Sequence, residues 1–225
     1  MRNNYKLIAL DLDGTLVDSA PDVAFAVDSM LVDLGREPLG VERVRGYIGN
    51  GVEILAKRAL TGEMWAEPPE SLYVQAMDRL LVHYAANNGK RSVIYPGVAD
   101  TLNNLKAAGL ALCCVTNKKR QFTCPLLDDL GLSPYFDLLV CGDDLEHRKP
   151  HPQPLWHAMQ KAGSGPRETM MVGDSVTDVK TARAAGVKVA AVSYGYNHGR
   201  DIRTAEPDWV IDSLAGICTI LRLAA

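Results

Sequence analysis

Five short apolar runs constrain the fold of this 225-residue chain more than any other feature. They cover residues 5–10, 110–116, 137–142, 168–173 and 187–193. Each run is shorter than a core helix and lacks polar alternation, so each predicts a fully buried strand. Helical patterns lie between them at 98–108, 120–130 and 177–185, and each is followed by a glycine. This alternation predicts an α/β fold with a parallel sheet covered on both faces.

The alternation is interrupted once, directly after the first strand. Residues 18–89 show only helical patterns, at 20–35, 50–60 and 68–89. This stretch is too long for a simple connection, so it predicts a separate helical domain inserted into the core. The expected division is a core of residues 1–17 and 90–225 with an insert of residues 18–89. The apolar pattern of residues 211–223 predicts a closing amphipathic helix.

Charge and hydropathy argue against two classes of binding partner, nucleic acids and membranes. The net charge is −3 and the charges are scattered, so we expect no nucleic-acid partner. No apolar run reaches the roughly 18 residues that span a bilayer, so we expect no membrane partner. The apolar stretch after Lys6 ends at Asp11, which is too short for a signal-peptide core, and we expect a cytoplasmic protein. The five cysteines, two of them adjacent, do not fit a disulfide framework. The sequence does not decide between a monomer and a homodimer.

Acids, a hydroxyl and a lysine follow four of the five predicted strands. Ligands of open parallel sheets bind at the carboxyl ends of the strands, where these residues should meet. The set is Asp11, Asp13 and Gly14 after the first strand, Thr116 and Asn117 after the second, Lys149 after the third, and Asp174 and Asp178 after the fourth. Alternate residues of an extended chain point the same way, so Asp11 and Asp13 can both face one cavity.

Three carboxylates in one place need a counter-charge. Crowding of Asp11, Asp13 and Asp174 is tolerable around a hard cation, and oxygen ligands suit Mg²⁺. Together with Lys149, such a cation would hold an anion, for which phosphate fits best. Gly14 would let the backbone turn around that anion. The residues therefore predict a magnesium-dependent phosphate site.

Four motifs in chain order resemble those of the haloacid dehalogenase superfamily. They are "DLDGTLVDS", "VTNK", "KPHP" and "GDSVTD", and the predicted insert lies where that superfamily carries its helical cap. The resemblance covers nearly the whole chain and implies a Rossmann-like core with an α-helical cap. Further strings, "YIGNG" and "YGYNHG", are similar to those of the bacterial phosphoglycolate phosphatases within the superfamily.

The resemblance implies a role for each matched residue. Asp11 would be the nucleophile that forms an aspartyl-phosphate, and Asp13 would protonate the leaving alcohol. Lys149 would offset the charge on nucleophile and phosphate. The remaining roles would be phosphate binding for Gly14, Thr116 and Asn117, metal binding for Asp11, Asp174 and the backbone carbonyl of Asp13, and orientation of a metal-bound water for Asp178.

Residues of the predicted insert would select the leaving group. Gly49, Asn50 and Gly51 stand at a predicted helix start, which suits an anion. We expect Arg45, Asn50 and Gly51 to contribute to specificity, with Arg43 and Lys57 as further cations that could hold a substrate carboxylate. The loop 193–199 could either border the site or only connect elements.

The resemblance favours a phosphatase of a small phosphorylated metabolite, 2-phosphoglycolate first. A phosphatase of another sugar or metabolite phosphate, and a phosphomutase, remain as alternatives. Capped mutases carry a histidine early in the linker to the cap, where this chain has Val23. Asp13 argues against the dehalogenase branch, which lacks the second aspartate. A non-catalytic phosphate sensor would be expected to lose Asp11, Lys149 or Asp174, and all three are present.

Overall fold

A six-stranded parallel sheet forms the centre of the computed structural model, which describes residues 4–223. Its spatial order is β5-β4-β1-β6-β7-β8. The strands are β1 (Leu7–Leu10), β4 (Ala111–Val115), β5 (Leu138–Val140), β6 (Thr169–Gly173), β7 (Lys188–Val192) and β8 (Trp209–Ile211). The predicted parallel sheet is confirmed, and β1 lies at its middle between β4 and β6.

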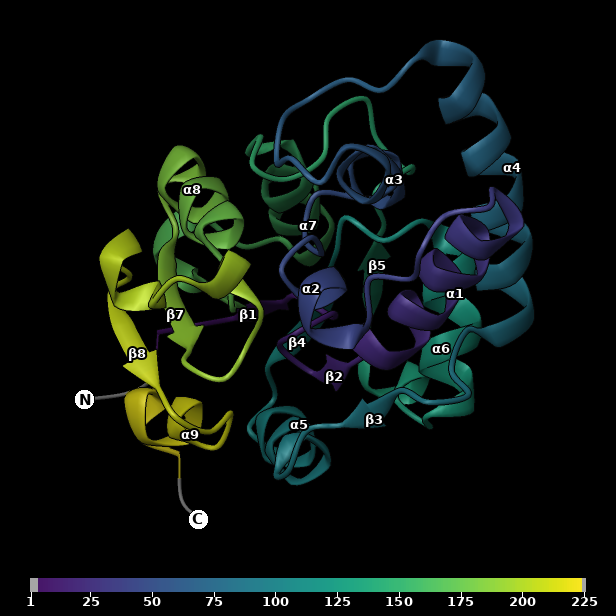
Figure 1. Cartoon of the computed structure of the whole chain (residues 1–225). Helices are drawn as coiled ribbons and strands as arrows, with labels where there is room; N and C mark the ends of the chain where they lie inside the picture. The colour runs from purple at the N-terminus through teal and green to yellow at the C-terminus, as the bar shows by residue number, and fades with distance from the viewer. Residues whose placement is uncertain (1–3, 224–225) are drawn as a thin grey trace.

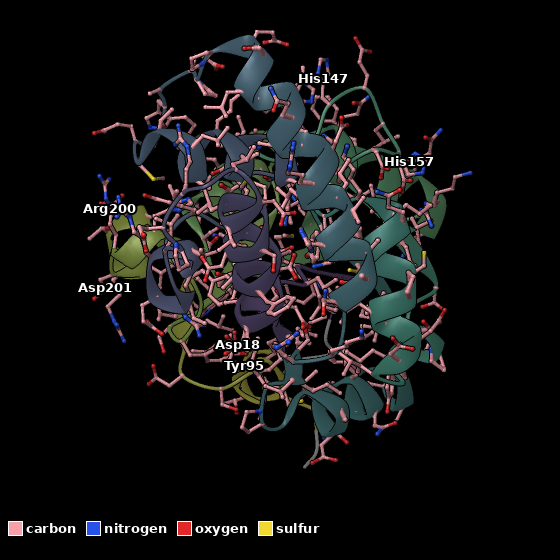
Figure 2. All side chains as sticks on the ribbon, turned by 45° about the vertical axis from the view of Figure 1, so that its right-hand side comes forward. Asp18, Tyr95, His147, His157, Arg200 and Asp201 are labelled. Atoms are coloured by element: carbon pink, nitrogen blue, oxygen red, sulfur yellow. The ribbon has the colours of Figure 1, made fainter. Side chains whose placement is uncertain are left out.

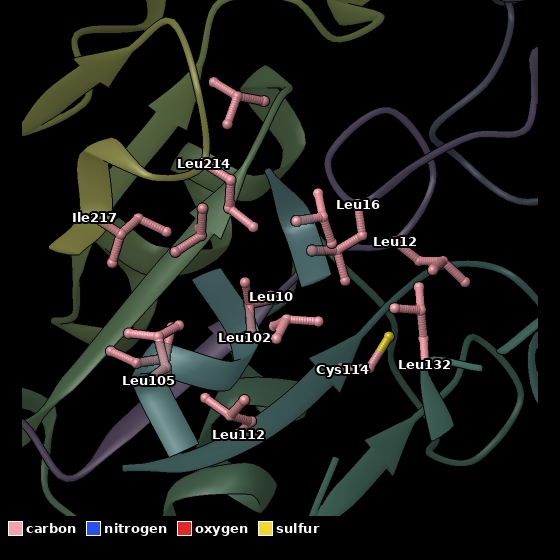
Figure 3. Packing of buried hydrophobic residues seen from close by; sticks show 14 of the residues in the cluster. Leu10, Leu12, Leu16, Leu102, Leu105, Leu112, Cys114, Leu132, Leu214 and Ile217 are labelled. Atoms are coloured by element: carbon pink, nitrogen blue, oxygen red, sulfur yellow. The ribbon is translucent and has the colours of Figure 1, made fainter. Parts of the chain in front are cut away.

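Helices cover both faces of this sheet. They are α5 (Val98–Ala107), α6 (Arg120–Asp129), α7 (Gln153–Ala162), α8 (Val176–Ala185) and α9 (Gly216–Leu221), with short 3-10 turns at Ser133–Tyr135, Pro166–Glu168, Asn197–Gly199 and Ile202–Ala205. Leu10 and Leu112 face the apolar layer formed with α5, α6 and α9 (Figure 3). Leu7 and Ala9 face the opposite layer, formed with α7 and α8. Because both strand faces are buried, the strands carry no polar alternation.

The predicted helical insert is confirmed and holds four helices. They are α1 (Ala20–Asp33), α2 (Val41–Arg45), α3 (Val52–Thr61) and α4 (Glu70–Asn87). Their apolar faces meet in a cluster of their own, in which Val27, Leu55 and Leu80 are buried. Phe122 of α6 and Tyr196 of the core join this cluster, so the insert packs against the core through apolar contact. In Figure 1, α1, α3 and α4 lie together on the side of the molecule opposite β8 and α9.

Helices α2 and α7 and strand β8 are additional to the predicted elements, and the closing helix is shorter than predicted. Ile211 ends strand β8, so the closing helix is only Gly216–Leu221 and the predicted helix over 211–223 is wrong in its first half. The backbone of β8 pairs with β7, which sequence periodicity alone does not report. Pro152 precedes α7 and Pro154 stands in its first turn, where proline is compatible with a helix.

All five cysteines are free thiols, and Cys113, Cys114 and Cys141 are buried as their apolar surroundings predict. No helix within residues 4–223 has the length and apolarity needed to cross a bilayer.

The two chain crossings between core and insert run side by side. Strand β2 (Val17–Asp18) leaves the core and pairs antiparallel with β3 (Val93–Ile94), which returns to it. The amide of Tyr95 donates to the carbonyl of Leu16 at 3.0 Å, which extends the ribbon by one bond. Figure 2 shows Asp18 and Tyr95 next to each other at this ribbon. The chain therefore crosses between core and insert, in both directions, at one narrow hydrogen-bonded ribbon.

A buried carboxylate on α1 holds the returning segment. Asp22 has no exposed surface and accepts hydrogen bonds from the amides of Gly89, Arg91 and Ser92 at 2.8–3.0 Å. The Ser92 hydroxyl donates a fourth bond to the same carboxylate. Since a buried carboxylate is stable only when its oxygens are paired, these four bonds fix the position of the chain that leaves α4.

We expect Asp22→Asn to lower the free energy of unfolding by about 2–4 kcal/mol, because the amide cannot accept all of these bonds and turns donors toward donors. Urea unfolding measures the change. The control is Asp33→Asn in the same helix, where an exposed carboxylate pairs with His83 and the expected loss is under about 1 kcal/mol. Equal losses for the two variants would contradict this role of Asp22.

Candidate active site

A buried lysine lies between two buried aspartates at the carboxyl edge of the sheet. Asp11 follows the last residue of β1, Lys149 comes from the segment after β5, and Asp178 stands in the first turn of α8. The Lys149 Nζ lies 2.7 Å from Asp11 Oδ1 and 2.7 Å from Asp178 Oδ1. The side chain of Lys149 is only 2% exposed, so water does not screen these contacts.

Burial controls the protonation of this group. Burial raises the pKa of the Asp11 carboxyl well above its ordinary value, against the opposite effect of Lys149. Burial alone lowers the pKa of the Lys149 ammonium, but the carboxylates of Asp11 and Asp178 outweigh it and the pKa lies above its usual value. Burial, and then the charge of Asp178, raises the pKa of Asp174 to about 7. When all three acids are ionised, the group carries more negative charge than its one lysine offsets, and the raised pKa values of Asp11 and Asp174 reflect burial and this repulsion.

Asp174 completes a compact group of three acids. Its carboxylate accepts from the Thr15 hydroxyl at 2.9 Å and from the Tyr196 amide at 2.7 Å. One carboxylate oxygen from each of Asp11, Asp174 and Asp178 lies within 4.8 Å of the other two. Such a buried all-oxygen set fits a hard divalent cation, which would offset the excess negative charge.

Two glycines make room for Asp174. A Cβ at Gly195 would lie 2.0 Å from the Cβ of Asp174, and one at Gly14 would lie 2.5 Å from its Oδ2. Gly14 also has φ = +86°, a backbone conformation that other residues rarely adopt. The amide of Gly14 donates to the Val17 carbonyl at 2.9 Å and is therefore already in use. In this structure Gly14 provides space for Asp174 and the geometry of the turn.

Asp13 has different partners from Asp11, although only one residue separates them. Its Oδ1 accepts from the Ser19 hydroxyl at 2.5 Å and from the Lys118 Nζ at 3.0 Å. Its carboxylate does not join the three-acid group within the described residues. The two acids of this tight loop thus contact different lysines. Asp11 contacts Lys149, and Asp13 contacts Lys118.

Thr116 and Asn117 both lie at the end of β4 and are almost fully buried. The Thr116 Oγ1 accepts from the Lys118 amide at 3.2 Å, which leaves its own hydrogen available to an anion. The Asn117 Nδ2 donates to the carbonyls of Gly49 and Lys149 at 3.0 Å each. Asn117 therefore joins the strand end to the insert and to the lysine segment.

The candidate specificity residues of the insert divide into two groups. Gly51 lines the site cavity, whereas Arg45 pairs with Asp18 at 3.0 Å and Asn50 accepts from Arg58 at 2.8 Å. Lys57 and Arg43 are also engaged within the insert, with Glu67 and Tyr47 respectively. The structure thus brings Gly51 to the cavity and holds the cations Arg43, Arg45 and Lys57 on partners elsewhere.

A cavity of about 50 Å³ lies between the strand ends and the insert. Polar groups of Asp11, Asp13 and Thr116 face it from the core, and Val23, Ile48 and Leu55 of the insert form apolar walls. Lys118, Tyr84 and Phe122 close the same space. A space of this size accepts a ligand group of only a few atoms.

The sequence analysis gives no role to four residues that contact the acids, namely Thr15, Ser19, Lys118 and Tyr196. Lys118 was present in the "VTNK" motif but received no role. Tyr196 belongs to the loop 193–199, for which two roles were open. Its amide donates to Asp174 and its hydroxyl accepts from the amides of Ser19 and Ala20, so the loop borders the site. Residue type gave no signal for this, because a backbone amide makes the contact with Asp174.

An ion-pair group joins the insert to the rim of the site. Glu53 of α3 lies 2.7 Å from Lys119 and 2.9 Å from Arg148, which are core residues adjoining Lys118 and Lys149. Burial alone would raise the pKa of the Glu53 carboxyl, but hydrogen bonds from Lys119 and Arg148 lower it to about 2. The pairing thus favours the position in which the insert covers the strand ends.

Fold and site together define an α/β protein with an aspartate–lysine centre at the carboxyl edge of its sheet and a helical insert above it. Residues 8–192 match the family of haloacid dehalogenase-like hydrolases. The chain belongs to that family, as its four motifs indicated.

Curated proteins and solved structures extend the comparison over the full chain. The phosphoglycolate phosphatase of Nitrosococcus oceani is 50% identical over 225 residues, which cover 100% of both chains. That of Thiobacillus denitrificans is 47% identical over 210 residues, or 93% of this chain and 92% of that protein. A crystal structure of a predicted phosphoglycolate phosphatase from Haemophilus somnus 129PT superposes with a TM-score of 0.91 at 36% identity, covering 96% and 98% of the two chains.

The Glu53 pairing predicts a pH-dependent contribution to stability. The folded pKa of about 2 lies below the usual 4.5, so the contribution is present above about pH 4.5 and is lost as the pH falls toward 2. At pH 7, Glu53→Gln should cost about 1–2 kcal/mol after allowance for solvent screening. Denaturant unfolding between pH 7 and 3 measures the difference from wild type, which should shrink on acidification. Glu67→Gln, which removes an exposed pair with Lys57, should cost under about 0.5 kcal/mol at any pH. A Glu53→Gln effect that grows with acid would contradict the prediction.

Gly195→Ala should weaken divalent-cation binding about 10- to 100-fold, because the added methyl group must displace Asp174 or the loop that donates to it. Calorimetric titration with Mg²⁺ and Mn²⁺ measures this directly. Gly165→Ala serves as control, since a Cβ there meets only the Glu168 carboxylate at an ordinary 3.8 Å. Unchanged affinity in Gly195→Ala would show that Asp174 does not hold the cation.

Proposed function

We propose that this protein is a magnesium-dependent phosphatase that hydrolyses a small phosphate monoester, with 2-phosphoglycolate as its substrate. The observation that carries the proposal is the buried Asp11 carboxylate at the strand end, held 2.7 Å from Lys149 beside two further acids. The full-length similarity to proteins named phosphoglycolate phosphatase supports the choice of substrate.

Asp11 acts as the nucleophile. Attack on phosphorus requires an ionised carboxylate in a site that also neutralises the incoming phosphoryl group. Lys149 provides a fixed positive charge for both, and Asp178 holds its ammonium from the opposite side at 2.7 Å. Asp178 therefore positions the lysine in addition to its proposed role toward a metal-bound water.

Mg²⁺ would be held by Asp11, Asp174 and the backbone carbonyl of Asp13. The compact group of buried acids fits this cation, and its role when bound is to offset the charge of the carboxylates and of the transferred phosphoryl group. Thr116 binds a phosphoryl oxygen through its hydroxyl. The side chain of Asn117 donates to the carbonyls of Gly49 and Lys149, so Asn117 contributes to phosphate binding through its backbone amide. Gly14 keeps the loop clear of the phosphoryl group.

Asp13 transfers the proton. Its carboxylate lies on the cavity wall, apart from the Lys149 contact, where it can protonate the leaving alcohol and then deprotonate the attacking water. Separate partners for Asp11 and Asp13 allow the two acids to act in different protonation states during one turnover.

Residues 18–89 form the cap domain that closes over the reaction. Its helices have a separate apolar cluster, its two crossings form one ribbon, and its residues wall the cavity on the side away from the sheet. Closure excludes water from the phosphoenzyme except for the attacking molecule. Gly51 and, more remotely, Arg45 and Asn50 shape the space for the leaving group.

Hydrolysis is favoured over phosphomutase chemistry. Val23 is 3% exposed and lines the cavity at the position where capped mutases carry a histidine. An apolar side chain there cannot exchange protons with a second substrate. Rates for a panel of small phosphate esters with Mg²⁺ test the proposal, and activity should disappear in chelator and return with added Mg²⁺.

Substitution of the two aspartates should give different results. Asp11→Asn removes the nucleophile, so no phosphoenzyme should form with any substrate. Asp13→Asn should lower the rate about 100-fold or more for 2-phosphoglycolate, and only about 10-fold for an aryl phosphate whose leaving group needs little protonation. Rapid quench and steady-state kinetics measure both effects. The assignment would be overturned by phosphoenzyme on Asp11→Asn, or by equal losses for the two leaving groups with Asp13→Asn.

A further inference from the structure

Lys118 is a buried cation to which neither the sequence motifs nor the proposed chemistry assigns a role. Its side chain is 3% exposed and lines the cavity between core and insert. The Nζ donates to Asp13 Oδ1 at 3.0 Å and to the Tyr84 hydroxyl. It therefore lies beside the acid that would protonate the leaving group, on the opposite side from Lys149.

One contact of the Lys118 ammonium is long enough for a ligand to replace it. A lysine ammonium carries three hydrogens, and its acceptors within residues 4–223 are Asp13 Oδ1 at 3.0 Å, Asp13 Oδ2 at 3.4 Å and the Tyr84 hydroxyl. The contact with Oδ2 exceeds the usual length of a hydrogen bond to a charged group. An anionic oxygen that enters the cavity can accept this hydrogen in place of Oδ2.

The other cations near the cavity pair with acids other than Asp13, the proposed proton donor. Lys149 lies between Asp11 and Asp178, and Lys119 is 2.7 Å from Glu53. Arg45, which the sequence favoured, pairs with Asp18 and is not among the residues that line the cavity. Lys118 is thus the cation best placed to meet a second negative charge on the substrate.

We propose that Lys118, oriented by Tyr84, determines specificity by binding a carboxylate on the leaving group. The inference rests on the proposed phosphatase function and names the residue that would select the substrate by binding its carboxylate. Asp13 must reach the ester oxygen, and Lys118 lies 3.0 Å from Asp13. Its ammonium therefore meets a carboxylate that one carbon separates from that oxygen, as in 2-phosphoglycolate.

Tyr84 makes this recognition depend on the insert. It stands on α4, and its ring stacks on Phe122 of the core with centroids 4.3 Å apart. Its hydroxyl contacts the Lys118 ammonium only when α4 lies against α6, as it does here. The small volume of this cavity, about 50 Å³, favours a small leaving group over those of sugar phosphates.

The experiment compares kcat/KM for 2-phosphoglycolate with kcat/KM for its neutral amide, 2-phosphoglycolamide. The two esters share size and leaving oxygen and differ in the carboxylate. Wild type should prefer the acid, and Lys118→Met should lower the acid-to-amide ratio about 10- to 100-fold. Lys118→Arg should recover part of the preference. Glycolate, as a competitive inhibitor, should bind Lys118→Met at least about 10-fold more weakly.

Tyr84→Phe is the second variant, since it keeps the lysine, the ring and the packing on Phe122. It should lower the same ratio about 3-fold or more through loss of the orienting hydroxyl. Lys119→Met is the matched control and should leave the ratio within about 2-fold, because Glu53 holds that ammonium.

The outcomes separate this inference from the function on which it rests. If wild type hydrolyses aryl phosphates with Mg²⁺ but the acid-to-amide ratio survives both Lys118→Met and Tyr84→Phe, the inference is overturned and the phosphatase activity stands. A ratio that collapses in Arg45→Met instead also overturns it. If wild type hydrolyses no phosphate ester, the proposed function fails and the inference fails with it.

Discussion

The contact of Lys149 with Asp11 and Asp178 is the interaction on which the rest of the site depends. Three carboxylates converge on one buried point, and without a positive charge their mutual repulsion and desolvation would separate them. The three partners come from segments far apart in sequence, after β1, after β5 and in α8. They meet because all strands are parallel and their carboxyl ends lie at one edge of the sheet. The fold therefore brings one positive charge to the three acids, and a bound divalent cation would offset the rest.

The same loop presents two acids to different surroundings. Both acids line the cavity, as strand-like alternation predicts. Asp11 also contacts Lys149 and the other acids, whereas Asp13 contacts Ser19 and Lys118. The turn at Gly14, with its positive φ, leaves space for Asp174 beside the loop. The two carboxylates, only two positions apart in the chain, therefore have different hydrogen-bond and ion-pair partners.

Several contacts hold the insert against the core, although the chain crosses between them only twice. A two-stranded ribbon carries both crossings, Asp22 fixes the returning segment, and Glu53 pairs with cations on the core. Tyr84 and Tyr196 add contacts across the boundary. Glu53 and Tyr84 contact the core segments that carry Thr116 and Lys149, so the packed insert and the candidate site share these segments.

The sequence by itself determined the sheet, the helical insert and the aspartates, hydroxyl and lysine at the strand ends. It could do so because buried strands have an apolar composition and because site residues follow them directly in the chain. Only the tertiary structure decided which groups contact the site residues. Arg45 lies against Asp18, Lys118 reaches Asp13, and the amide of Tyr196 holds Asp174. It also added β8 and α7, whose existence depends on pairing with β7 and packing on the sheet. Such contacts join residues tens of positions apart, and their side-chain or backbone geometry leaves no periodic or local pattern in the sequence.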